Sequence, residues 1–121
     1  MRQFSQAVCE RIGYYVYILK DPRTMQIFYV GKGTGNRLFQ HVYCAITSSS
    51  SSDKLSLIRE ILDAGFEVEY YILRHGLSEE QALEIESACI DLLGLDSLTN
   101  DAKGHNFWER GLKTVDEIIQ Q

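Results

Sequence analysis

The chain has 121 residues, the length of one domain with a working hydrophobic core, and we expect a single domain over residues 1–121. No stretch approaches the ~18 consecutive apolar residues of a membrane span, and the first residues lack the apolar segment of a signal peptide. These features exclude a membrane protein and predict a soluble, cytoplasmic one. The formal net charge of −5 does not by itself indicate a polyanionic partner.

The charge divides unevenly along the chain. Residues 1–59 carry eight Lys and Arg against three Asp and Glu, a balance of +5, and residues 60–121 carry the remaining four against fourteen, a balance of −10. A basic first half is compatible with one face that contacts nucleic acid. The alternative is that the division reflects only a run of acidic helices in the second half.

Two strands joined by a tight turn are predicted near the start of the chain. Residues 14–19 and 26–31 are rich in aromatic and β-branched side chains, and Asp-Pro-Arg-Thr at 21–24 is a turn sequence. Side chains alternate along a strand, so Tyr15, Tyr17 and Leu19 should share one face. Ile27, Tyr29 and Gly31 should share a face of the neighbouring strand. Tyr17 and Tyr29 can then present two hydroxyls side by side if the hairpin register allows.

The rest of the chain predicts one more strand and several helices. Serine at 52 caps a helix over 54–64 that ends at Gly65, and Ser78 with Gln81 opens another that ends at Gly94. The other predicted elements are a helix over 36–47, a strand over 68–73, a final helix over about 114–120 and a further helix within 2–12. This order predicts an α+β domain, a small three-stranded antiparallel sheet flanked by helices.

A motif follows the hairpin. Phe-Tyr-Val-Gly-Lys-Gly at 28–33 comes after the tyrosine strand Tyr15-Val16-Tyr17, and it precedes an arginine and a histidine four residues apart. The full pattern comprises Asp21-Pro22-Arg23, Tyr29, Lys32, Arg37, His41, Glu86, Leu98-Thr99-Asn100 and Gly104. Over about residues 14–104 it resembles the GIY-YIG nuclease superfamily, in the branch that supplies the nuclease domain of LEM-domain and ankyrin-repeat endonucleases.

Two tyrosine registers fit this resemblance. Tyr15 stands where the first glycine of the motif's name would be, which the branch allows, and Tyr17 is then the motif tyrosine. The register Gly13-Tyr14-Tyr15 puts the two motif tyrosines farther apart than is usual in the superfamily. We therefore take Tyr17.

The resemblance implies a GIY-YIG-like fold and a metal-dependent endonuclease acting on DNA, branched or otherwise structured DNA included, with RNA left open. It implies Mg²⁺ or Mn²⁺ as the cofactor and Glu86 as its ligand. The site residues it implies are Tyr17, Tyr29, Lys32, Arg37, His41, Glu86 and Asn100. A homodimer or a partner protein would supply specificity.

Glu86 also stands out without the resemblance. At ~100° per residue it falls inside an apolar stripe of its helix, while Glu80, Glu84 and Asp91 lie opposite as solvated carboxylates. The stripe consists of Ala82, Ile85, Cys89, Ile90 and Leu93. A carboxylate that faces inward must be paired or bind a metal, so it either binds the ion or bonds a core tyrosine or arginine.

Arg37 and His41 are four residues apart and should share one face of their helix. The arginine suits phosphate because its fork donates two hydrogen bonds and never loses its charge. The general base stays open between Tyr17, with a reference pKa of ~10, and His41, with a reference pKa of ~6.5. The competing hypothesis for the whole chain is a non-catalytic domain of the same fold that binds nucleic acid or a protein.

Overall fold

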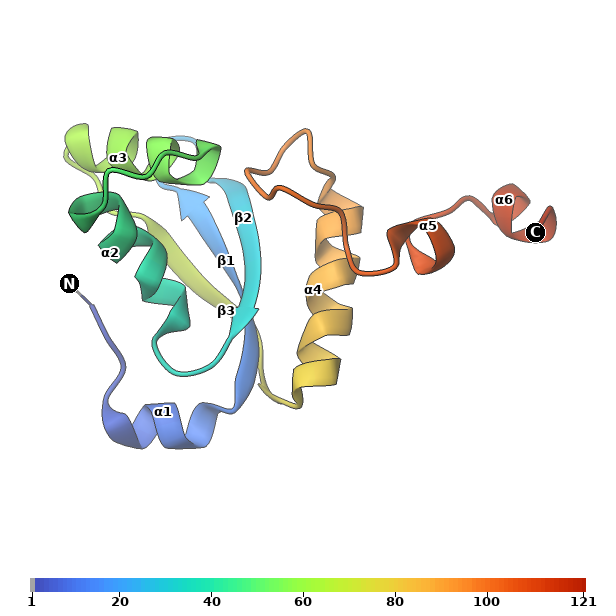
Figure 1. The fold of residues 1–121 in the computed structure, drawn as a ribbon, viewed down its shortest axis with the longest axis horizontal. Helices are drawn as coiled ribbons and strands as arrows, with labels where there is room; N and C mark the ends of the chain where they lie inside the picture. Colours follow the sequence, from blue (N-terminus) through green and yellow to red (C-terminus); the bar gives the residue numbers. More distant parts are fainter. Residues whose placement is uncertain (1) are drawn as a thin grey trace.

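Three antiparallel strands form the centre of the computed structural model, which describes residues 2–121 (Figure 1). They are β1 (Tyr14–Asp21), β2 (Gln26–Gly33) and β3 (Glu69–Leu77), in the spatial order β2-β1-β3. The helices are α1 (Gln6–Ile12), the 3-10 turn η1 (Arg37–Phe39), α2 (Gln40–Thr47), α3 (Asp53–Asp63), α4 (Glu79–Leu93), α5 (Phe107–Arg110) and α6 (Val115–Ile119). The predicted α+β class is confirmed.

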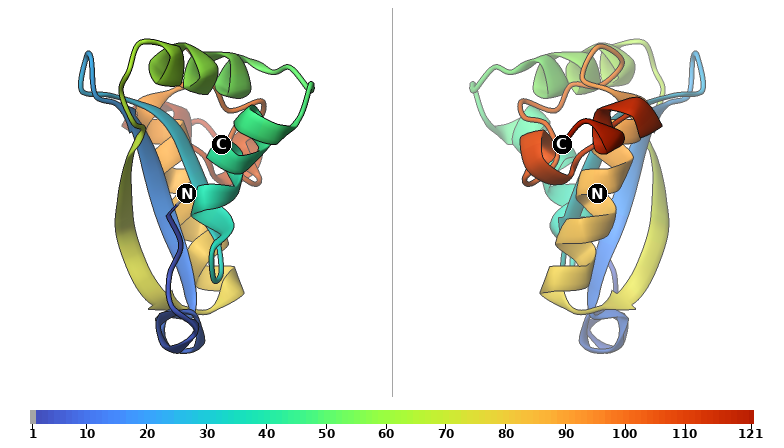
Figure 2. Two further views of the ribbon diagram at one scale, coloured as in Figure 1. Left: turned by 90° about the vertical axis from the view of Figure 1, so that its left-hand side faces the viewer. Right: turned by 90° about the vertical axis from the view of Figure 1, so that its right-hand side faces the viewer.

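The sheet separates two helical layers. Helices α2 and α3 cover one face and α4 covers the other, and the chain then runs away from the sheet through α5 and α6 (Figures 1 and 2). The α2/α3 face buries a core that includes Tyr15, Tyr17 and Leu19, while the α4 face buries a smaller core that includes Val16 and Val30. Because β1 is central, its alternating side chains fill both cores.

The predicted hairpin forms, but a β-bulge changes which side chains of β2 point to the same face of the sheet. Tyr17 pairs with Gly31 and Leu19 with Tyr29, and the register then shifts so that Lys20 pairs with Ile27. The shift turns Ile27 toward the α4 core, whereas Tyr29 packs on the α2/α3 core. The expectation that Ile27 and Tyr29 share a face is therefore wrong, and no sequence pattern marked the extra residue.

Most predicted boundaries hold within a few residues. Ser52 caps α3, and Ser78 with Gln81 forms the full capping box of α4, which ends at Gly94. Strand β2 continues to Gly33 rather than ending at Gly31, and β3 extends to Leu77. The short α5 was not predicted. No helix within residues 2–121 is long and apolar enough to cross a membrane.

Gly31 is the glycine on which this arrangement depends. A Cβ at this position would lie 2.5 Å from both Cζ and Oη of Tyr17, on the strand opposite. The ring of Tyr17 therefore lies directly over the glycine. The residue is needed here for close approach and not for an unusual backbone angle, because its φ is not positive.

We predict that Gly31→Ala lowers the free energy of unfolding by roughly 1–3 kcal/mol, because the added methyl overpacks the Tyr17 ring. A double-mutant cycle with Tyr17→Leu, measured by urea unfolding, isolates this contact. In the Tyr17→Leu background the alanine should cost much less, since the distal ring atoms are gone. Equal costs in the two backgrounds would contradict the assigned contact.

Candidate active site

Tyr17, Tyr29 and His41 form a cluster from three elements, β1, β2 and α2. The hydroxyl oxygen of Tyr17 lies 2.5 Å from Nε2 of His41. The ring of Tyr29 lies 4.8 Å from that of His41 and 6.1 Å from that of Tyr17, measured between centroids. The hairpin register and the packing of α2 on the sheet thus bring together three of the residues predicted for the site.

Burial keeps the Tyr17–His41 pair uncharged near neutral pH. Tyr17 is 1% exposed, and this burial raises its pKa well above the ordinary tyrosine range. His41 is 8% exposed, and burial together with the charges of Lys54 and Arg37 lowers its pKa to about 4. A protonated phenol and a neutral imidazole therefore share one short hydrogen bond.

Arg37 lies at the start of η1, exposed to solvent beside the cluster. Its stem rests on Gly33, where a Cβ would lie 2.5 Å from Cγ of Arg37. The segment predicted as one helix over 36–47 begins as a 3-10 turn, so Arg37 and His41 do not share a continuous α-helical face. The charge of Arg37 nevertheless acts on His41, and within residues 2–121 this guanidinium forms no salt bridge.

Glu86 approaches from the opposite layer, on α4. It is half-buried, and this burial raises its pKa, while the charge and backbone of Lys32 oppose the rise. The inward position predicted from the stripe is thus observed. Two details predicted for this helix are wrong: Leu93, placed in the apolar stripe, is 38% exposed at the helix end, and Asp91, placed opposite as a solvated carboxylate, accepts a hydrogen bond from the backbone of Gly104 at 2.9 Å.

Asn100 closes the open edge of β2. Its side chain accepts from the Val30 N–H at 3.1 Å and donates to the Val30 carbonyl at 2.8 Å, while the Thr99 N–H donates to the Phe28 carbonyl at 2.7 Å. Since Val30 uses both ends of the amide, the geometry gives Asn100 an orienting role at the edge of the site.

The family model of the LEM-3-like GIY-YIG domain matches residues 14–117. The chain belongs to this nuclease-type family. It is 29% identical over 111 residues to the ankyrin repeat and LEM domain-containing protein 1 homolog of Caenorhabditis elegans, covering 74% of this chain and 16% of the relative. It is also 29% identical over 121 residues to the human ankyrin repeat and LEM domain-containing protein 1, covering 75% and 20%. The chain thus spans a small part of either relative, and no solved structure matches it significantly.

Lys54 lies beside the cluster of Tyr17, Tyr29 and His41, and sequence reasoning missed it. Its Nζ lies 4.4 Å from the centroid of the Tyr29 ring, and within residues 2–121 it has no salt bridge. Burial lowers its pKa, and the charge of Asp101 opposes this. A lysine in the first turn of a helix after a serine run carries no motif, so only the packing of α3 beside α2 places it here.

Tyr15, the residue at the motif's first glycine position, supports the loop that carries Arg37. Its hydroxyl donates to the Gly35 carbonyl at 2.8 Å and accepts from the Leu38 N–H at 3.2 Å. It thereby joins β1 to both ends of that loop. Tyr15 is a structural partner of the site, whereas Tyr17 holds the histidine.

The side chains of the site offer few ligands to a divalent ion. Within residues 2–121 no group of three or more His, Cys, Asp or Glu side chains is placed to hold a metal. Mg²⁺ commonly binds through one or two carboxylates and completes its shell with waters and substrate phosphates. A single half-buried carboxylate such as Glu86 fits that mode and does not fit an all-protein cage.

We predict that the free energy of unfolding falls on acidification between pH 6.5 and 4, because the unfolded chain protonates His41 before the folded chain does. The loss should be on the order of 1–3 kcal/mol. Urea unfolding at several pH values measures it, and His41→Gln should flatten this part of the profile. His75→Gln, at an exposed histidine, is the matched control.

The titration of the His41 imidazole can also be followed directly, by NMR spectroscopy of its ring signals. Lys54→Met removes a cation that lowers the pKa of His41, so the imidazole should titrate at higher pH in this variant. Lys103→Met, an exposed lysine beside Phe107 and Trp108, should leave the titration unchanged. An imidazole signal that titrates near 6.5 in the wild type would contradict the assigned environment.

Proposed function

We propose that this domain is a metal-dependent endonuclease that hydrolyses phosphodiester bonds in DNA, branched or otherwise structured DNA included. The observation that carries the proposal is the convergence of a tyrosine–histidine pair, a solvent-exposed arginine and a half-buried carboxylate at the β2 edge of the sheet. Membership of a nuclease-type family supports the same reaction class.

Glu86 would hold the divalent ion, Mg²⁺ or Mn²⁺. Nucleases of the GIY-YIG type generally depend on such an ion. When bound, the ion supplies positive charge to the phosphate oxygens. Because burial raises the pKa of Glu86, proton binding competes with metal binding more than it would at an exposed glutamate.

Arg37 and Lys32 bind the phosphate in this proposal. The exposed guanidinium of Arg37 can donate two parallel hydrogen bonds to phosphate oxygens, and Gly33 lets its stem lie close to the sheet. Lys32, from the end of β2, adds a second positive charge. Such donors stabilise the charge that develops on the phosphate oxygens during hydrolysis.

Tyr17 and His41 move the proton. With His41 protonated at Nδ1, the hydroxyl of Tyr17 donates to Nε2, and the phenolic oxygen accepts the proton of the attacking water as its own proton passes to the imidazole. The water oxygen bonds to phosphorus, the bond from phosphorus to the leaving oxygen breaks, and that alkoxide takes a proton from solvent. Neither group suffices alone: burial makes Tyr17 reluctant to ionise, and it holds His41 away from solvent. Proton transfer by positioned side chains typically contributes ~10²–10⁴-fold in rate.

A non-catalytic binding domain of the same fold is the second candidate, and the net charge of −5 favours it over a nuclease that acts alone. In either case we assign substrate selection to a second copy of the chain or to a partner. Because substrate selection is not assigned to this chain alone, RNA is tested beside DNA.

We predict that Glu86→Gln lowers the cleavage rate by ~10²–10³-fold, because the metal loses its carboxylate while the neutral amide fits the same space. The assay is cleavage of labelled duplex, single-stranded and four-way-junction DNA, and of single-stranded RNA, with Mg²⁺ or Mn²⁺ and with chelator. Glu80→Gln, an exposed glutamate of the same helix, is the matched control.

Loss of cleavage in Glu86→Gln and in chelator, with the control active, supports the nuclease. Wild-type protein that binds DNA without cutting any substrate favours the binding domain instead. Unfolding midpoints of the variants show whether each one is folded.

A further inference from the structure

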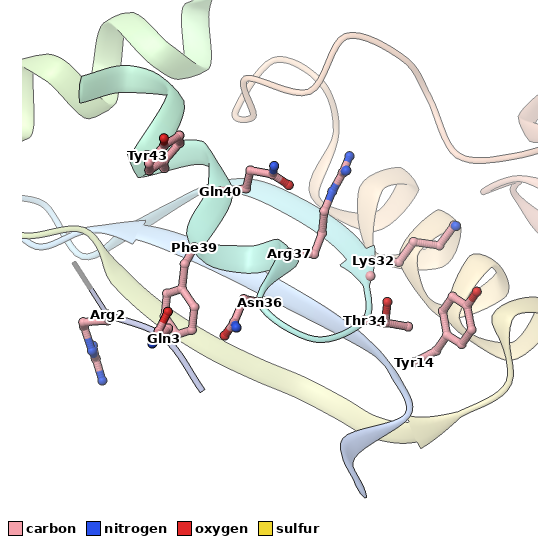
Figure 3. Close-up of a pocket in the computed structure, with 11 residues that line it drawn as sticks. Arg2, Gln3, Tyr14, Lys32, Thr34, Asn36, Arg37, Phe39, Gln40 and Tyr43 are labelled. Carbon is pink, nitrogen blue, oxygen red and sulfur yellow. The ribbon is translucent and has the colours of Figure 1, made fainter. Parts of the chain in front are cut away.

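A groove of about 780 Å³ adjoins the site and extends away from it over η1 and α2 (Figure 3). It shares Lys32 and Arg37 with the site, whereas Tyr17, Tyr29, His41 and Glu86 do not line it. Its other prominent side chains are Arg2, Tyr14, Phe39 and Tyr43. The groove is therefore a neighbouring surface with chemistry of its own.

The lining combines cations with aromatic rings and excludes carboxylates. Arg2, Lys32 and Arg37 are its charged residues, and none of its lining residues is Asp or Glu, in a chain with 17 acidic and 12 basic residues. One carboxylate, that of Glu79, lies nearby and accepts a hydrogen bond from the Tyr14 hydroxyl at 3.3 Å. The lining thus has the opposite charge to the protein as a whole.

The walls of the groove are held in place by defined contacts. The Phe4 N–H donates to Oδ1 of Asn36 at 2.6 Å, and the Phe4 ring meets that of Phe39 edge-on at 5.1 Å. These contacts fix the segment around Phe4 against the loop before η1. The guanidinium carbon of Arg2 lies 5.7 Å from the centroid of the Tyr70 ring, and its side chain points away from Arg37 (Figure 3). On the other wall Arg37, Gln40 and Tyr43 follow each other at intervals of three (Figure 3).

Tyr43 is the exposed aromatic residue of the groove's lining, whereas Tyr14 and Phe39 are half-buried. It is 50% exposed, and within residues 2–121 its ring has no aromatic or cationic partner. Proteins that bind single-stranded nucleic acid combine a positive groove along the backbone with aromatic rings on which bases stack. A double helix keeps its base faces stacked inside and offers none to such rings.

We propose that this groove binds the single-stranded segment of DNA that adjoins the scissile phosphate, with a phosphate on Lys32 and Arg37 and a base on Tyr43. The position of the strand in the groove rests on the proposed nuclease function, because Lys32 and Arg37 belong to both the groove and the hydrolytic site. It adds a binding site for unpaired nucleotides to the hydrolytic site.

The test is binding of a fluorescent oligo-dT and of a blunt duplex of equal length to the whole chain, by anisotropy in chelator. Tyr43→Ala should weaken oligo-dT binding by ~5- to 100-fold, the loss of one stacked base, and change duplex binding by less than twofold. Arg37→Ala should weaken oligo-dT binding and reduce its salt dependence. Trp108→Ala, which removes a 78% exposed ring on α5, is the matched control.

Equal oligo-dT affinity in Tyr43→Ala and wild type would overturn the proposal, as would absence of oligo-dT binding by the wild type. Preferential binding of a poly-glutamate peptide at the groove would overturn it in favour of a protein partner. Because binding is measured without metal, a chain that cuts nothing but loses oligo-dT through Tyr43→Ala would keep the groove and reject the nuclease. Cleavage by the wild type, with unaltered oligo-dT binding in Tyr43→Ala, would keep the nuclease and reject the groove.

Discussion

The hydrogen bond between Tyr17 and His41 is the interaction on which the candidate site depends. It is possible because Gly31, opposite Tyr17 on β2, leaves room for the ring to lie across the strand. The bond connects the central strand to α2, and burial of both partners keeps them uncharged. A side chain at position 31 would therefore disturb both the sheet and the Tyr17–His41 pair.

The edge position of β2 explains how groups from both helical layers meet. An edge strand leaves backbone N–H and C=O groups unpaired, and here Thr99 satisfies the carbonyl of Phe28 while Asn100 satisfies both the N–H and the carbonyl of Val30. His41 reaches the edge from one layer and Glu86 from the other. Cationic side chains and the Glu86 carboxylate can thus lie close together at the edge between the two cores. They do so in a protein whose net charge is negative.

The sequence was sufficient for the elements and insufficient for their exact packing. Caps such as Ser78 with Gln81 act locally, so the ends of α4 could be predicted, as could the inward position of Glu86. The bulge that separates Ile27 from Tyr29 depends on pairing between strands, which no local pattern records. The packing of α3 places Lys54 over the Tyr29 ring, whereas the sequence around Lys54 resembles the first turn of an ordinary helix.

We propose that Tyr17 and His41 form the proton-transfer pair of a nuclease. The most direct measurement is the single-turnover rate of DNA cleavage by Tyr17→Phe, with DNA affinity measured in parallel. Tyr70→Phe, the same change at a half-buried tyrosine of β3, is the control. If the pair transfers the proton, we expect a ~10²–10⁴-fold loss of rate in Tyr17→Phe with DNA affinity nearly unchanged. A wild-type rate in Tyr17→Phe would contradict it.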